Sequence, residues 1–238
     1  MRPILALAVL MLLGCPLARE VQAASLEISP VLVTLAAGQT AATIEVTNHG
    51  GAPSAIQARV YRWTQAGDDD ALAPTHDIIV SPPIFTIADG GSQTMRLLLR
   101  GGIAAGAERS YRLLLDEVPP PNMQNRHVVF ALRLSLPVIV RASSSGRPTL
   151  QWRAQRGASG QTMLTASNAG AAYDKVRAID VTLADGSHPK VVSRGTNSYI
   201  LGGAERHWIV QDPHGGPGGP LHLSVTSLTG KSELILTP

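Results

Sequence analysis

The sequence predicts an all-β protein, made of two immunoglobulin-like β-sandwich domains that follow a cleaved signal peptide. Three observations support this fold class. Short segments with an apolar residue at every second position recur along the chain, and Gly, Pro, Asn and Asp separate them. No segment shows a helical apolar period long enough to predict a helix. Hydrophobic residues make up 44% of the 238 residues, which is enough for packed cores.

Residues 1–24 are expected to be a secretory signal peptide. They contain one early positive charge, an apolar run over 4–13, and small residues that place cleavage near Ala23/Ala24. The run is shorter than the roughly 20 residues that a membrane-spanning helix needs. The segment LLGC ending at Cys15 loosely resembles a lipoprotein cleavage site, so lipidation of Cys15 is the alternative. Cys15 is the only cysteine, so cleavage after it would leave a mature chain without disulfides, stabilised by its cores alone.

The first domain is expected over residues 25–142. Ile44 and Val46 illustrate the alternation that predicts its strands, which we place at 26–35, 42–48, 55–63, 77–87, 93–100, 109–117 and 127–141. The last strand contains VVFALRLSLPVIVRA, with large apolar side chains at every second position from residue 128 to 138. Pro137 has no backbone N–H, so we expect this strand at a sheet edge. A long apolar edge strand invites aggregation, which soluble proteins normally prevent.

A second domain is expected over residues 149–238, after a polar linker, SSSGRP, at 143–148. Its predicted strands are 149–154, 161–167, 174–183, 189–193, 198–201, 206–211, 221–227 and 232–236.

Composition and motifs argue against several classes of function. The formal charge is +3 with dispersed arginines, and aromatic residues make up only 4%, so we expect no nucleic-acid partner. The seven histidines have no metal-ligand spacing, and no cofactor is expected. Asp68, Asp69 and Asp70 lack the glycine and glutamate of a calcium loop and are interpreted as a solvated loop. No nucleophile elbow or phosphate loop occurs, so neither an enzyme nor a small-molecule substrate is expected.

Four arginines lie inside predicted strands: Arg96, Arg112, Arg133 and Arg141. They are either solvent-facing residues or parts of a carboxylate site near the edge strand, because guanidinium binds a carboxylate through two parallel hydrogen bonds.

Several segments together resemble the periplasmic chaperones of the chaperone–usher pathway of pilus assembly. The similar segments, in chain order, are SLEISPVLVTL at 25–35, ATIEVTNHGGAPSAIQARVYRW at 42–63, IIVSPPIFTIADGGSQTMRLLL at 78–99, SYRLLLDEVPPP at 110–121 and the apolar strand at 128–142. The resemblance is weaker over residues 149–238.

The resemblance implies that the apolar edge strand is lent to a pilus subunit whose own sandwich lacks a strand. Val128, Phe130, Leu132 and Leu134 would be the inserted side chains. The partners would be pilus subunits and an outer-membrane usher, in the periplasm, with no cofactor. Self-association of the free protein through the exposed strand stays open.

The chain departs from the better-known branches of this family, in which a first-strand arginine and a lysine of the lent strand anchor the subunit's C-terminal carboxylate. Pro30 and Pro137 occupy those positions here. The segments SPVLV and LSLPVIV instead resemble the archaic branch, which moves the anchor to other basic residues. Arg112 is therefore the first candidate for the anchor, and Arg96 is the second. Glu117 and Arg141 are similar to a structural ion pair of the family.

Two alternative functions remain from the sequence. One is a pilus structural subunit or adhesin, although the first domain has all seven expected strands. The other is an exported β-sandwich enzyme or sugar-binding protein.

Overall fold

The computed structural model describes residues 25–101, 108–119, 131–142, 146–157, 161–211 and 219–238. The predicted signal peptide and the donor residues Val128 and Phe130 lie outside these ranges. The described residues form eighteen β-strands. Within them, no helix is both long enough and apolar enough to span a membrane. The predicted all-β class, with two immunoglobulin-like sandwiches, is confirmed.

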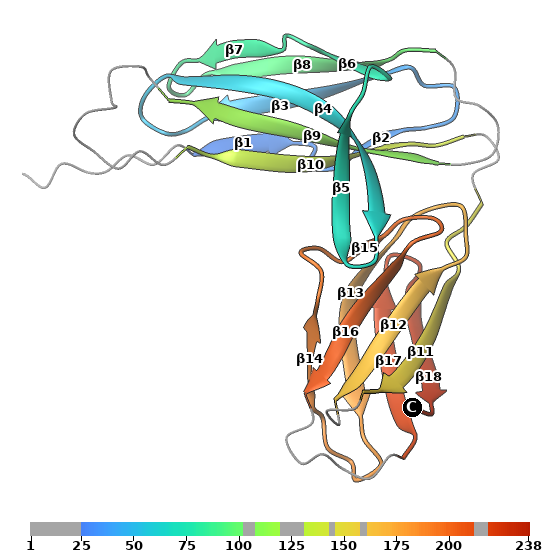
Figure 1. Ribbon diagram of the computed structural model, residues 1–238. Coiled ribbons are helices and arrows are strands. Elements are labelled where there is room, and N and C mark those ends of the chain that lie inside the picture. The colour runs from blue at the N-terminus through green and yellow to red at the C-terminus, as the bar shows by residue number, and fades with distance from the viewer. Residues whose placement is uncertain (1–24, 102–107, 120–130, 143–145, 158–160, 212–218) are drawn as a thin grey trace, which may run out of the picture.

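The first sandwich consists of two sheets packed face to face (Figure 1). One sheet has four strands, in the order β1 (Leu26–Ser29), β3 (Ala41–Asn48), β8 (Ser92–Leu99) and β6 (Ile78–Ser81). The other has six, in the order β2 (Val33–Leu35), β10 (Arg133–Val140), β9 (Arg109–Val118), β4 (Ser54–Ala66) and β5 (Asp69–Pro74), with β7 (Ile84–Ile87) paired to β4.

Alternating side chains of the two sheets fill the space between them. Met95 and Leu97 of β8 are fully buried, and they belong to the same apolar cluster as Leu113 of β9 and Val138 of β10. The residues between them on β8 are partly or fully exposed. This period of two is the pattern from which the strands were predicted.

The second sandwich follows the same plan. One of its sheets has the order β11 (Leu150–Arg156), β12 (Thr162–Asn168), β16 (Glu205–Gln211) and β14 (Lys190–Ser193). The other has the order β15 (Tyr199–Ile200), β13 (Asp174–Thr182), β17 (Leu221–Ser227) and β18 (Gly230–Leu236). Leu164, Val181 and Val210 are fully buried between these sheets.

The same asparagine hydrogen-bonding arrangement occurs in both domains. Asn48, at the end of β3, donates from its side-chain amide to the carbonyls of Ala52 and Ile87. Asn168, at the end of β12, donates in the same way to the carbonyls of Ala172 and Ile200. Each asparagine thereby closes the turn that follows it and satisfies carbonyls that would otherwise be buried without partners.

The predicted strands are found, with three differences. Of the strand predicted at 127–141, the described residues 131 and 132 are not in a strand, and β10 begins at Arg133. The segments 26–35 and 77–87 are each split into two strands, at Pro30 and at Pro82–Pro83, where no N–H is present to continue a ladder. The sequence prediction missed β5, because it interpreted Asp68, Asp69 and Asp70 as a solvated loop. In the structure these residues lie at the tip of a long hairpin made by β4 and β5.

The two sandwiches form an L, and the β4–β5 hairpin extends from the first to the second (Figure 1). Between them lies a small apolar cluster that contains Trp63 and Ile139 of the first domain and Tyr173 and Leu201 of the second. Strands β1 to β10 precede the predicted linker, and β11 to β18 follow it.

Candidate functional site

The first half of β10 has an unpaired edge. On one side β10 pairs with β9 along its whole length, from Arg133 to Val140. On the other side the short parallel strand β2 covers only Val138 to Val140. Among the described residues, nothing pairs with β10 from Arg133 to Pro137 on that side. We call the backbone of residues 133–137 on this side the open edge.

The backbone groups of the open edge belong to the odd-numbered residues. The N–H of Glu117 donates to the carbonyl of Leu132, so even-numbered residues of β10 direct their backbone groups to β9. The N–H of Arg141 donates to Leu35 on the outer side, which is consistent with this alternation. Arg133 and Ser135 therefore present N–H and C=O groups to the open edge. Pro137 has its missing N–H on this outer side, so no hydrogen bond to β9 is lost there.

The even-numbered side chains of β10 point toward the core of the first domain. Leu136 and Val138 are buried in that core, whereas Leu134 only packs against its margin and is half-buried. Leu132, just before the strand, is also half-buried. Two predicted donor side chains, Leu132 and Leu134, are thus partly uncovered beside the open edge, while Val128 and Phe130 lie outside the described residues.

Arg112 lies on β9, on the face that is turned toward the second domain. Its guanidinium carbon is 3.7 Å from the ring centre of Trp63, and its Nη2 is 3.5 Å from Asp70 Oδ2. Only 8% of the residue is exposed. Burial lowers the pKa of Arg112, and the neighbouring carboxylate of Asp70 counteracts this effect.

Arg96 does not lie near Arg112. It belongs to β8 in the other sheet of the sandwich, opposite Thr43 and Ser81, and its side chain is exposed on the outer face. Of the two arginines proposed as anchors from the sequence, only Arg112 lies between the domains, and it lies on β9, the strand that pairs with β10.

The ion pair expected between Glu117 and Arg141 is wrong. Glu117 accepts hydrogen bonds from the Ser54 hydroxyl and from the N–H of Leu132. Arg141 lies at the opposite end of β10, where its Nε is 3.6 Å from Glu108 Oε2. The reason is the antiparallel register of β9 and β10, which places the beginning of one strand beside the end of the other.

Arg141 nevertheless lies next to a contact between the domains. The other carboxylate oxygen of Glu108 accepts a hydrogen bond from the N–H of Tyr173, in the second domain, at 3.0 Å. The Glu108 side chain is only 3% exposed, and burial raises its pKa although Tyr173 and Arg141 oppose this effect. The partner of Arg141 was not predicted, because Glu108 lies just before the strand predicted at 109–117.

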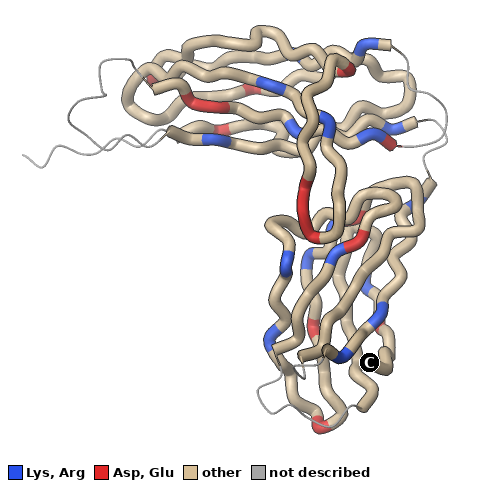
Figure 2. The backbone as a smooth tube through the Cα atoms, in the orientation of Figure 1, with Lys and Arg blue, Asp and Glu red and all other residues tan. Residues whose placement is uncertain are grey.

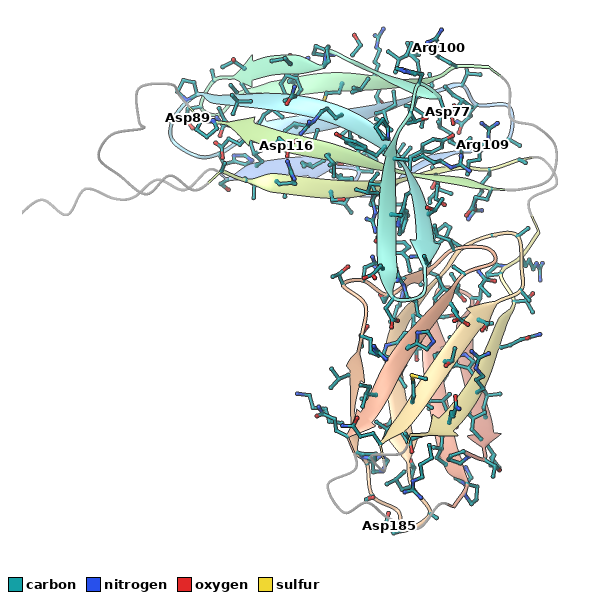
Figure 3. The ribbon with its side chains drawn as sticks, in the orientation of Figure 1. Asp77, Asp89, Arg100, Arg109, Asp116 and Asp185 are labelled. Atoms are coloured by element: carbon teal, nitrogen blue, oxygen red, sulfur yellow. The ribbon has the colours of Figure 1, made fainter. Side chains whose placement is uncertain are left out.

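The sequence analysis also did not predict a cluster of three charged side chains on the six-stranded sheet. Asp116 of β9 binds Arg59 of β4 and Arg133 of β10, one through each carboxylate oxygen. Burial would raise the pKa of Asp116, but hydrogen bonds from the two arginines lower it below its ordinary value. Figure 3 shows Asp116 far along the sheet from Arg109, at the other end of β9. Three adjacent strands supply these residues, so only the register shows that they meet.

The three consecutive aspartates do not form a loop in solvent. Asp68 and Asp70 bind residues of the second domain and are partly buried, whereas Asp69 is exposed. Figure 2 shows this acidic tip of the hairpin directly above the second domain. In the part of the chain that the structure describes, no group of three His, Cys, Asp or Glu residues could hold a metal ion.

Comparison with known proteins agrees with this architecture. Residues 25–145, half of the chain, match the family described as pili and flagellar-assembly chaperone, PapD N-terminal domain. The chain is 24% identical over 127 residues to an uncharacterized fimbrial chaperone, YhcA, of Escherichia coli K12. This match covers 53% of the chain, and the chain spans about half the length of that relative.

Solved structures match nearly the whole fold. The archaic chaperone–usher Csu complex of Acinetobacter baumannii, CsuC–CsuE, contains a chain with 22% identity and a TM-score of 0.65, with 90% of this chain and 98% of that chain covered. The complex of the SafA pilin with the SafB chaperone of Salmonella enterica gives 19% identity and a TM-score of 0.61, with 90% and 96% covered. At these identities the likeness shows the fold.

The family match, together with two immunoglobulin-like sandwiches joined in an L, identifies the class of the protein. The chain belongs to the pili and flagellar-assembly chaperones, a family of chaperones rather than of enzymes.

Proposed function

We propose that this protein binds pilus subunits in the periplasm, stabilises them by lending them the open edge of β10, and delivers them to an outer-membrane usher. The observation that carries the proposal is the unpaired backbone of residues 133–137, with Leu132 and Leu134 partly uncovered beside it. An incoming strand would hydrogen-bond to the free groups of Arg133 and Ser135 and cover these leucines, which is β-strand addition.

The apolar pattern continues toward the N-terminal side of β10, at Val128 and Phe130. Each apolar side chain of this size, when fully buried, contributes roughly 1.5–3 kcal/mol before ordering costs are subtracted. Four such side chains on one strand are enough for a stable but reversible complex. Reversibility is what transfer of the subunit to an usher requires.

Arg112 is the proposed anchor for the C-terminal carboxylate of the subunit. Its guanidinium lies between the two domains, and the strand that carries it pairs with β10. Two relatives of the same fold, CsuC and SafB, were solved as complexes with a tip adhesion subunit and with a pilin, which supports a subunit as the partner here.

Co-expression in a bacterial periplasm with a candidate pilus subunit tests the proposal, with recovery of a one-to-one complex as the measurement. Leu132→Asp is expected to abolish recovery, because a charge would enter the apolar groove of the subunit. Ile84→Asp is the matched control, because Ile84 is an apolar side chain of the same size in the first domain, on β7, and is 62% exposed. Arg112→Ala should lower recovery, whereas Arg96→Ala should not.

Ser135→Pro tests the backbone contribution by itself. It removes an N–H that points to the open edge, so the melting temperature of the free protein should stay nearly unchanged while recovery of the complex falls strongly. Equal recovery with the wild type, Leu132→Asp and Ser135→Pro would contradict strand lending. If no subunit is stabilised and the protein instead polymerises on the cell surface, it is a pilus component.

A further inference from the structure

The tip of the β4–β5 hairpin, residues 67–70, binds the second domain through charged side chains. One oxygen of Asp68 accepts hydrogen bonds from the backbone N–H of His207 at 2.9 Å and from His207 Nδ1 at 3.0 Å. Its other oxygen is 3.5 Å from Nε of Arg194. These contacts join residues far apart in the sequence, and they tie the first domain to β16 of the second.

Asp70 is bound from both domains at once. Within the first domain, one of its oxygens accepts from the Gln65 amide at 3.1 Å, and the other is 3.5 Å from Nη2 of Arg112. From the second domain, Arg206 and Asn197 each donate a short hydrogen bond to it. Its carboxylate therefore lies between two guanidinium groups, one from each domain.

Arg206 depends on the hairpin for its pairing. The residue is 1% exposed, and Asp70 is the acidic side chain with which it is paired among the described residues. Its other two nitrogen atoms donate to backbone carbonyls, Nη1 to Gly67 at 3.0 Å and Nε to Tyr199 at 3.2 Å. Loss of the Asp70 carboxylate would leave this buried guanidinium with an uncompensated charge, so the pair favours one arrangement of the two domains.

The surface of the second domain is shaped to receive the hairpin. A Cβ atom at Gly195 would lie 3.1 Å from the backbone oxygen of Asp68 and 3.5 Å from Arg206 Nη1. The glycine thus gives the hairpin room to approach closely. Side-chain hydrogen bonds of Gln65 extend the contact, with one to the carbonyl of Tyr199 and one from the N–H of Leu201.

We propose that Asp70 is a positioning residue that fixes the second domain against the first and, through the same carboxylate, holds the guanidinium of Arg112 in place for a subunit's carboxylate. The second half of this inference rests on the proposed function, whereas the first half does not. Asp70 compensates the positive charges of Arg112 and Arg206. Without it, these two buried cations would have no carboxylate between them.

The orientation of the domains in the free protein is tested with Asp70→Asn. Spin labels on Thr94→Cys in the first domain and Ser232→Cys in the second report the distance distribution between the domains. Both residues are exposed, and Cys15, the only native cysteine, precedes the described residues. Asp69→Asn is the matched control, because it makes the same chemical change one residue away on an exposed side chain.

Asp70→Asn is expected to broaden the distance distribution, while Asp69→Asn should leave it as in the wild type. An unchanged distribution in Asp70→Asn would overturn the role of the hairpin in fixing the domains. This measurement needs no subunit, so its result is independent of the proposed function.

A double-mutant cycle tests whether Asp70 acts on subunit binding by positioning Arg112. The measurement is the affinity for the candidate pilus subunit. Asp70→Asn alone is expected to weaken binding about tenfold. In an Arg112→Ala background the same substitution should have little further effect. Full additivity of the two substitutions would contradict positioning of Arg112 by Asp70. If the wild type binds no subunit at all, the proposed function fails and the second half of the inference fails with it, while the domain orientation result still stands.

Discussion

The guanidinium of Arg112 lies 3.7 Å from the ring centre of Trp63, and both residues are almost completely buried. A cation over the face of an aromatic ring is attracted by the ring electrons, and such a contact contributes on the order of 2 kcal/mol when it is desolvated. Nη2 of the same guanidinium is 3.5 Å from Asp70 Oδ2. Arg112 is therefore held by two partners before any ligand is bound.

Arg112→Lys should reduce binding of a pilus subunit although it keeps the positive charge. An ammonium group cannot stack on Trp63 in the same way, and it cannot donate two parallel hydrogen bonds to a carboxylate. We expect recovery of the complex to fall about tenfold, measured by co-purification. Arg96→Lys on the outer face of the opposite sheet is the control, and binding unaffected by Arg112→Lys would remove Arg112 as the anchor.

Glu108→Gln should change how stability depends on pH. Burial raises the pKa of Glu108 above its ordinary value of 4.5, so the folded protein holds this proton more tightly than the unfolded chain does. Its contribution to stability is therefore complete below pH 4.5 and is lost as the pH rises through the raised pKa. The glutamine variant has no such loss, so its melting temperature relative to the wild type should increase as the pH rises from 4.5 through the raised pKa of Glu108.

Glu45→Gln is the control for this measurement, because Glu45 is an exposed residue of β3. Its melting temperature relative to the wild type should show no comparable rise with pH. A constant difference for Glu108→Gln over the same range would show that Glu108 titrates alike in the folded and unfolded chains.

Gly170→Ala should destabilise the second domain. A Cβ atom at this position would lie 2.2 Å from the carbonyl oxygen of Arg147 and 2.7 Å from the backbone nitrogen of Thr149, so the segment leading into β11 would have to move. Overpacking against backbone costs about 1–3 kcal/mol, which lowers the melting temperature by several degrees. Gly146→Ala is the control, since its nearest contact would be an ordinary one, 3.7 Å from the Ala171 side chain. Equal melting temperatures for the two variants would contradict the close packing of Gly170.

Asn48→Ala should destabilise the first domain, because it leaves the carbonyls of Ala52 and Ile87 without their side-chain donor. A buried polar group that loses its hydrogen-bond partner lowers the free energy of unfolding by about 1–3 kcal/mol. Calorimetry should show the loss in the transition of the first domain, and Asn168→Ala should give the corresponding loss in the second. Gln93→Ala on β8 is the control, since the Gln93 side chain bonds only to the exposed carbonyl of the neighbouring Thr94. An Asn48→Ala protein as stable as the Gln93→Ala protein would argue against this capping role.

Local pattern was sufficient for most of the strands. Alternation of apolar residues is a property of a few consecutive positions, and so the sequence placed β8, β9 and the described part of β10 correctly. Pro137 likewise indicated an unpaired edge, because proline has no backbone N–H to donate to a neighbouring strand. The structure limits that edge to residues 133–137, because β2 covers Val138 to Val140.

Partners across strands could not be obtained in this way. Arg96 and Arg112 look alike in the sequence, each in an apolar strand, yet they lie on different sheets. The contacts of Asp68 and Asp70 with Arg206 and His207 join positions that are 136 or more residues apart.

The sequence by itself determined the class of fold, the positions of most strands and the apolar strand with an incomplete edge, because each depends on neighbouring residues. Only the tertiary structure decided which charges meet: Arg141 with Glu108, Asp116 with two arginines, and Asp70 with an arginine from each domain. These pairings depend on strand register and on how the sheets and domains pack. Both arise from contacts summed over the whole chain, and no short stretch of residues encodes them.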